Sequence, residues 1–249
     1  MKTFVKWLCY FTVAIVISTI LVVGFYHFSR QDEMDHQVVR ESVLSIRDEV
    51  FQVRGTAWVT EVNGDRVVIT AKHILQNRIN SQLWGLPLFG EPLVNEGIKV
   101  QGFNGEECYV SIISFDDVAD IDNNQWHDWI ILSCPCELDN IPALPLAEET
   151  PCFGETLIWC GYPDTPYGAV GGEAIMSDYL EDGEMYRMGG VAGLGASGSP
   201  VYCTDYGVVG MLTRIYHNTG FAKAINIPMI LDEIEEEYLI DLLEQSEVH

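Results

Sequence analysis

Short apolar runs separated by turn residues dominate the chain from residue 51 to residue 225. Runs of this kind, bounded by Gly, Pro, Asn, Asp or Ser, are typical of β-strands. One pair is joined by Asn63-Gly64, a dipeptide that favours the left-handed backbone of a tight hairpin turn. Many short strands at this spacing predict a sandwich or a barrel. The predicted strands cover residues 56–62, 66–70, 98–103, 107–114, 129–133, 155–160, 170–177, 185–189, 200–204, 207–215 and 220–225.

The two ends of this β-rich region follow other patterns. Residues 230–249 place apolar side chains about one helical turn apart with acids between them, which predicts a closing helix, and Pro228 suits its start. Residues 30–50 are polar with a few apolar positions at partly helical spacing. They predict a linker or a short helix.

The N-terminal segment has the composition of a membrane span. Residues 7–28 contain no Asp, Glu, Lys or Arg, and about 20 apolar residues suffice for one helix across a bilayer. Lys2 and Lys6 precede the segment and acids follow it, so the positive-inside rule places Met1 in the cytoplasm and the remaining chain outside it. We therefore expect a single-pass membrane anchor over residues 1–29. A cleaved signal peptide is the competing interpretation, although its apolar core is usually shorter.

The net charge of the chain limits which macromolecules are expected to bind it. The chain has 13 basic and 37 acidic residues, a net charge of −24. A phosphate backbone is repelled by such a protein, so we expect no nucleic-acid partner. Solubility, or adaptation to a salty medium, is a sufficient reason for the acidity.

The cysteines and acids predict neither a metal site nor another cofactor. Six cysteines lie beyond the apolar segment, which suits an exported domain but leaves their pairing open. Cys134-Pro-Cys136 lacks the C-x2-C spacing of a zinc knuckle, and no second pair matches it. Asp120-x-Asp122-x-Asn124 begins like a calcium loop but lacks the glycine and glutamate that complete an EF-hand.

Candidate catalytic residues come from three separate segments. The run GLGASGSPVY at residues 193–202 crowds small residues around Ser197. A serine hydroxyl needs a base, usually a histidine oriented by a buried carboxylate. His73 directly follows a predicted strand, and Asp128 opens the apolar run Trp129-Ile130-Ile131-Leu132. His127 and Asp128 are adjacent and point to opposite faces of an extended chain, so they do not serve one site together.

These segments resemble the signatures of the trypsin-like (chymotrypsin-fold) serine proteases. Thr70-Ala71-Lys72-His73, Asp128 with its apolar run, and Gly195-Ala196-Ser197-Gly198-Ser199-Pro200 occur in that family's order, over roughly residues 51–230. The resemblance implies an all-β fold of two six-stranded antiparallel β-barrels followed by a C-terminal helix. The expected organisation is an anchor over 1–29, a linker or short helix over 30–50, a protease domain over 51–229 and an acidic helix over 230–249.

The resemblance also implies a mechanism and a substrate class, a protein or peptide. Ser197 would attack the peptide carbonyl and form an acyl-enzyme, His73 would carry the proton and Asp128 would orient the imidazole. The backbone N–H groups of Gly195 and Ser197 would bind the oxyanion. Ala196 stands where zymogen-activated members carry Asp, so the chain is closer in style to bacterial exported members that need no activating cut.

Further roles are carried over by analogy. The pocket for the residue before the cut, expected to prefer small or apolar side chains, is assigned to Val191, Gly210, Met211, Leu212, Thr213, Phe221 and Ala222. Lys223 is an alternative that favours an acidic side chain instead. Lys72 stands where the family carries alanine beside the histidine, and its charge would be harmless there if the side chain points to solvent. A Cys160–Cys203 disulfide is a further hypothesis.

Two rival functions remain open at this point. One is a catalytically silent protease-like fold that acts as a membrane-tethered binding module. The other is an esterase, which is disfavoured because G-x-S-x-G on an α/β sheet and the order Ser, Asp, His are expected for that class.

Overall fold

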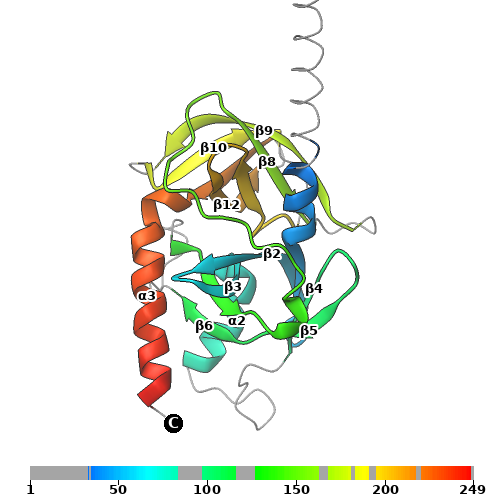
Figure 1. Cartoon of the computed structure of the whole chain (residues 1–249), viewed down its shortest axis with the longest axis vertical. Coiled ribbons are helices and arrows are strands. Elements are labelled where there is room, and N and C mark those ends of the chain that lie inside the picture. Colours follow the sequence, from blue (N-terminus) through cyan, green and yellow to red (C-terminus); the bar gives the residue numbers. More distant parts are fainter. Residues whose placement is uncertain are drawn as a thin grey trace, which may run out of the picture. The chain divides into compact units, whose positions relative to one another are not determined.

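Two groups of antiparallel strands and a long C-terminal helix make up the computed structural model (Figure 1). The structure describes residues 33, 35–83, 97–115, 127–162, 168–180, 183–190, 195–216 and 220–247. Its elements are β1 (Val43–Asp48), β2 (Val53–Val62), β3 (Asp65–Thr70), α2 (Lys72–Leu83), β4 (Ile98–Gln101), β5 (Glu107–Tyr109), β6 (Ile112–Phe115), β7 (Ile130–Ser133), the short 3-10 helix η2 (Cys136–Leu138), β8 (Thr156–Gly161), β9 (Val170–Leu180), β10 (Met185–Gly189), β11 (Pro200–Cys203), β12 (Gly207–Tyr216), β13 (Phe221–Asn226) and α3 (Ile227–Glu247).

The N-terminal residues form a unit of their own, residues 1–37, and residues 38–249 form the other. The predicted anchor over residues 7–28 lies outside the described residues. None of the helices in the described ranges is long and apolar enough to cross a bilayer. Within the region expected to be a linker or helix, residues 35–42 are helical, but residues 43–48 form β1, which pairs with both β2 and β4.

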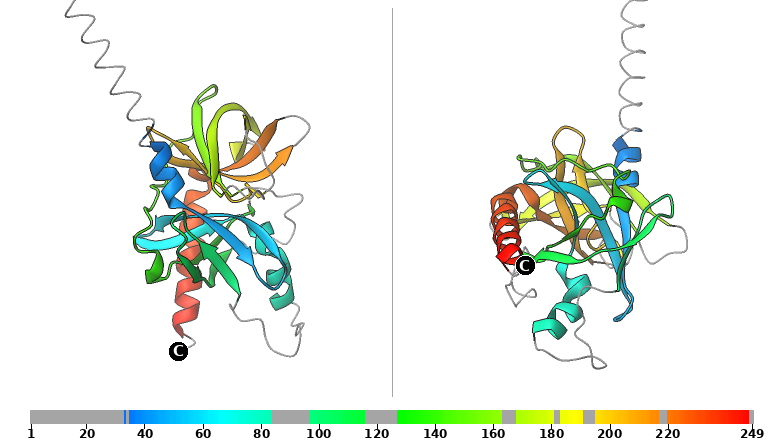
Figure 2. Two further views of the ribbon diagram at one scale, coloured as in Figure 1. Left: turned by 90° about the vertical axis from the view of Figure 1, so that its right-hand side faces the viewer. Right: turned by 60° about the horizontal axis from the view of Figure 1, so that its bottom comes forward.

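The second group of strands closes into the predicted six-stranded barrel, in the order β10-β13-β12-β11-β8-β9. Side chains of alternate residues fill its interior, among them Trp159, Tyr186 and Leu212. Figure 2 shows this barrel, in yellow and orange, beside the blue, cyan and green strands of the first group.

The first group differs from the prediction of a second six-stranded barrel. Its described strands form a seven-stranded sheet in the order β5-β4-β1-β2-β3-β7-β6. The two end strands, β5 and β6, are joined by only two residues, Val110 and Ser111, so the sheet must curl until its ends nearly meet. Ser111 bonds back to Ser133 through N–H to Oγ at 2.9 Å and through its carbonyl at 2.8 Å. The first group of described strands is therefore a curled sheet, or half-barrel, rather than a closed barrel.

Two local predictions are confirmed. Asn63 and Gly64 have φ angles of 53° and 87°, the left-handed pair required for the turn between β2 and β3. The closing helix is present as α3, which packs against β6 and β12 and so runs along both strand groups (Figure 1). Its inward face buries Ile230, Ile234 and Tyr238.

Candidate active site

The pairing of β3 with β7 brings His73 and Asp128 together. Thr70, the last residue of β3, lies opposite Ile130, the first of β7. In an antiparallel pair the residue after one strand and the residue before the other leave the sheet at the same end. The His73 Nδ1 and Asp128 Oδ2 atoms are therefore 2.6 Å apart, and the other carboxylate oxygen accepts the His73 backbone N–H at 2.7 Å.

This double contact fixes the imidazole at the first turn of α2. The Asp128 carboxylate satisfies one N–H of a helix start, where amides have no partner within the helix. Asp128 is 2% exposed, whereas the His73 side chain is 37% exposed. A buried carboxylate that orients a half-open imidazole leaves the Nε2 edge of the ring available to a neighbour.

The loop that carries Ser197 is bound to β2. The backbone N–H of Thr56 donates to the Ser197 carbonyl at 2.9 Å, and the Thr56 hydroxyl donates to the Gly195 carbonyl at 3.0 Å. A Cβ on Gly198 would overlap the Thr56 carbonyl and the Thr70 hydroxyl and would lie 3.1 Å from the Ala71 nitrogen. The glycine is therefore needed for the close approach of this loop to the strand end from which His73 follows.

The serine side chain itself is half-buried. Its Oγ donates to the Thr213 carbonyl at 3.3 Å, and among the described residues no hydrogen bond joins it to His73. The structure thus pairs His73 with Asp128 and places the Ser197 loop against the end of β3, with the hydroxyl turned toward β12.

Backbone donors lie beside the hydroxyl. Gly195 has a φ of 90°, which favours glycine. Within the described residues, the N–H groups of Gly195 and Ser197 have no backbone acceptor. Amide donors beside a serine hydroxyl are of the kind that can stabilise an oxyanion.

The residues predicted to line the pocket differ in burial and in the side of the barrel wall that they face. Met211 and Leu212 are fully buried on opposite faces of β12, and Thr213 is 6% exposed next to Ser197. Ala222 points into the barrel, whereas Phe221 is 37% exposed. Gly210 is also buried in β12. Val191 lies outside the described residues.

A sequence comparison decides the family. The model of the trypsin-like peptidase domain matches residues 55–211, more than half of the chain and all three candidate segments. The chain belongs to the trypsin-like peptidase family. Membership in this family supports serine endopeptidase activity. No curated protein matches the chain in sequence.

Solved structures support the fold of this trypsin-like peptidase. It resembles the serine endoprotease from Yersinia pestis (TM-score 0.60, 18% identity), covering 81% of this chain and 65% of that one. It also resembles the HtrA-type protease AlgW, solved with a tripeptide (TM-score 0.58, 16% identity, 80% of this chain and 62% of that one). The Rv3671c protease of M. tuberculosis H37Rv in its inactive form is a third neighbour (TM-score 0.57, 18% identity, 80% and 90%). The peptidase therefore spans just under two thirds of the first of these chains.

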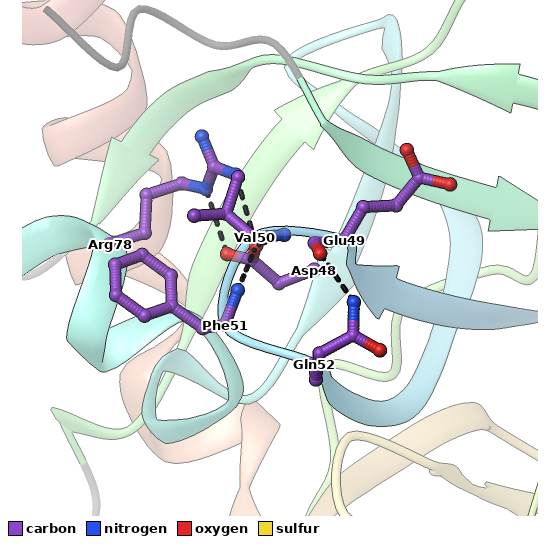
Figure 3. Close-up of polar contacts among 6 residues, drawn as sticks. All are labelled: Asp48, Glu49, Val50, Phe51, Gln52 and Arg78. Atoms are coloured by element: carbon purple, nitrogen blue, oxygen red, sulfur yellow. Dashed lines mark hydrogen bonds and ion pairs between the residues drawn. The ribbon is translucent and has the colours of Figure 1, made fainter. Parts of the chain in front are cut away.

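A buried ion pair that the sequence did not reveal holds α2 in this peptidase. Arg78 and Asp48 form two hydrogen bonds, Nε to Oδ2 at 2.8 Å and a terminal guanidinium nitrogen to Oδ1 at 3.0 Å, with side chains 0% and 1% exposed. Asp48 also accepts the backbone N–H groups of Val50 at 2.9 Å and Phe51 at 3.1 Å (Figure 3). The pair ties α2, the helix that carries His73 in its first turn, to the turn between β1 and β2.

Thr56 is a second residue that sequence reasoning missed. Besides its two bonds to the serine loop, its hydroxyl accepts the Tyr162 N–H at 2.8 Å. A threonine in a β-rich run gave no signal, because its role depends on contacts with residues far along the chain.

The Lys72 side chain is buried, at 2% exposed, so it does not take the solvent-facing position in which its charge would be harmless. The hypothesis of a Cys160–Cys203 disulfide is wrong, because both cysteines are free thiols. Val201 of β11 pairs with Trp159 of β8, and in this register Cys160 and Cys203 are not opposite each other. They also face opposite sides, because Cys203 packs in the barrel interior and Cys160 in the other core.

The described residues contain no group of three or more His, Cys, Asp or Glu side chains arranged to hold a metal ion. His127 lies away from the His73–Asp128 pair, with its Nδ1 3.4 Å from a carboxylate oxygen of Glu233 on α3.

Proposed function

We propose that the chain hydrolyses peptide bonds through Ser197, activated by His73 and oriented by Asp128. Rotation of the Ser197 side chain away from the Thr213 carbonyl turns its hydroxyl toward the open edge of the imidazole. His73 then accepts the proton as Ser197 Oγ attacks the peptide carbonyl, and later gives it to the leaving amine. The hydrogen-bonded pair of His73 and Asp128 at 2.6 Å is the observation that carries this proposal.

The same loop supplies the oxyanion site. The N–H groups of Gly195 and Ser197 stabilise the negative oxygen of the tetrahedral intermediate. Loss of one such donor typically costs about 3–4 kcal/mol of transition-state stabilisation. The two bonds from Thr56 keep these amides in place while the substrate binds.

Beyond Met211, no described strand pairs with β12 on its β11 side, and this edge accounts for how a peptide reaches the serine. The last pair between β11 and β12 is Pro200 with Met211, yet β12 continues to Tyr216. A substrate strand that pairs with this edge lies beside Ser197 and uses main-chain hydrogen bonds that any peptide offers. Small or apolar residues at the cut site remain our expectation for the pocket near Val191.

The localisation is proposed from the sequence. Residues 7–28 anchor the peptidase in a membrane as a single span, with the N-terminus cytoplasmic and the catalytic part periplasmic or extracellular. We expect the full chain to remain in the membrane fraction after alkaline carbonate extraction. Its release would show that the segment is removed or does not insert.

Comparison of wild type with Ser197→Ala on a peptide library tests the activity. We expect wild type to cut and the variant to lose at least about a thousandfold in kcat/KM, because the nucleophile is essential to the mechanism. Equal activity of the two proteins would overturn the mechanism. A folded wild type that cuts nothing would instead support the catalytically silent binding module.

A further inference from the structure

All the lysines and arginines after Lys99 lie on three adjacent strands of the barrel, at positions that pair directly with one another. They are Arg187, Arg214 and Lys223. Arg187 of β10 pairs with Lys223 of β13, and Lys223 pairs with Arg214 of β12. Directly opposed residues in an antiparallel sheet project from the same face. Three adjacent strands therefore carry a basic row, which we define as these three residues.

The basic row is on the outer face of the barrel. The sequence neighbours Tyr186, Met188, Ala222 and Ala224 all fill the barrel interior, so the residues between them point outward. Ile215, next to Arg214, also packs toward the interior. Arg187 and Lys223 are half-buried and Arg214 is exposed.

Apolar rows border the basic row on both sides. On one side, Met185, Ile225 and Met211 are fully buried. On the other, Phe221 and Tyr216 lie opposite each other, each 37% exposed. The Arg187 guanidinium carbon is 5.9 Å from the centre of the Phe221 ring. The outer face thus offers cations next to aromatic rings, a combination that suits acidic side chains on an otherwise apolar or extended peptide.

One acidic residue lies at the end of this row that is away from β12. Asp178 of β9 pairs with Arg187, so it faces the cation most distant from β12. Arg214, at the other end, follows Thr213, whose carbonyl accepts the Ser197 hydroxyl. The Arg214 end of the row is therefore the end beside the nucleophile.

A peptide on the open edge of β12 extends this sheet by one strand. Every second side chain of the added strand then projects from the same face as Arg214. If the strand is antiparallel to β12, the residues that face Arg214 precede the scissile bond. The basic row is about 10 Å across, from the spacing of neighbouring strands, which is wide enough for more than one carboxylate.

From this placement we propose that the peptidase selects substrates with acidic residues in the segment before the cut, through Arg214, Lys223 and Arg187. This selection rests on the proposed peptidase function, and it names a substrate class for the same site. It is distinct from the pocket for the residue at the cut. At physiological salt the Debye length is about 8 Å, so repulsion from distant acids is screened while contacts with the basic row remain.

Matched peptides measure this preference. Each pair carries Glu or Gln at one of the positions before the cut and is otherwise identical. For wild type we expect the Glu peptide to have the higher kcat/KM by about tenfold at the best position, a typical effect of a charge-assisted hydrogen bond. Arg214→Gln should reduce this ratio to within about twofold of one, and Arg214→Lys should retain most of it because the charge is kept.

Lys99→Gln is the matched control, since Lys99 is a cation of the first sheet that is paired with Glu107. Its Glu-to-Gln ratio should equal that of wild type. Cutting of both peptides at equal rates by wild type would overturn the acidic preference and leave the peptidase function intact. So would a loss of the preference in Lys99→Gln equal to that in Arg214→Gln.

A binding measurement distinguishes failure of the acidic preference from failure of the proposed peptidase function. If wild type cuts no peptide, the proposed function fails, and fluorescence anisotropy of the same labelled peptides on the Ser197→Ala chain still reports on the basic row. Tighter binding of the Glu peptide that Arg214→Gln abolishes supports the recognition surface. Equal binding of the two peptides contradicts it.

Discussion

Arg78→Met isolates the buried ion pair that anchors α2. Methionine keeps much of the volume of the arginine stem but removes the guanidinium, so the Asp48 carboxylate loses both of its charged hydrogen bonds. The backbone N–H groups of Val50 and Phe51 remain as its donors. Because both side chains are at most 1% exposed, the carboxylate cannot turn to water. Removal of one partner from such a pair typically costs about 3–5 kcal/mol.

This is a large share of the free energy of unfolding, which is about 5–15 kcal/mol for a typical domain. Urea denaturation of wild type and Arg78→Met gives the difference directly. In thermal unfolding each kcal/mol shifts the midpoint by about 2–4 °C at this size, so the variant should melt roughly 6–20 °C lower.

A second substitution distinguishes loss of the ion pair from loss of packing. In Asp48→Asn combined with Arg78→Met, the buried charge is gone and the amide oxygen still accepts from the turn. We expect the double variant to recover at least about 2 kcal/mol relative to Arg78→Met alone. A loss below about 1 kcal/mol in the single variant would refute the reasoning. So would a double variant no more stable than the single one.

Three further outcomes follow from the structure. Thr56→Val keeps the shape of the side chain but removes the hydroxyl that holds the serine loop, so we expect kcat to fall and the free energy of unfolding to drop by about 1–3 kcal/mol, measured by kinetics and urea denaturation. Gly198→Ala should abolish activity and destabilise the chain far more than Gly64→Ala. Both glycines have positive φ, but only Gly198 lacks space for a Cβ, and equal melting temperatures would contradict this. Burial raises the pKa of the Cys160 thiol to about 11, so iodoacetamide at pH 8 should modify the exposed Cys152 much faster, as read by mass spectrometry; equal rates would count against the buried position.

Local signals in the sequence predicted much of the strand pattern. Asn63-Gly64 fixed one hairpin because its backbone preference is intrinsic to the two residues. The run at residues 185–189 coincides with β10, since turn residues bound it on both sides. Helix α3 was predictable because its buried residues recur with the helical period.

What the sequence did not predict depends on contacts between distant segments. Residues 43–48 were expected to be linker or helix, yet β1 forms because β2 and β4 pair with it on both sides. Helix α2 was also missed. Its stability depends on Arg78 meeting Asp48, which lies 30 positions away along the chain. The proposed disulfide failed because strand register, invisible in the sequence, puts Cys160 and Cys203 on opposite faces.

The candidate site was predictable only as a set of residue types. Order and spacing singled out His73 and Asp128, and the structure pairs them at 2.6 Å. The role of Ser197 as their partner stays a prediction, since its hydroxyl is turned to Thr213. No pattern in the sequence indicated that the cations Arg187, Arg214 and Lys223 would align, because they are separated by turns of different length.

Covalent labelling with a fluorophosphonate tests most directly whether Ser197 is an activated nucleophile. Mass spectrometry of the wild-type chain should find one adduct, on Ser197, and His73→Ala should lose it while keeping the fold. Ser199→Ala is the matched control, since that hydroxyl of the same loop is buried and is not one of the three proposed catalytic groups, so its loss should leave labelling intact. A folded wild type that forms no adduct, or an adduct on Ser197 that persists without His73, would contradict the account.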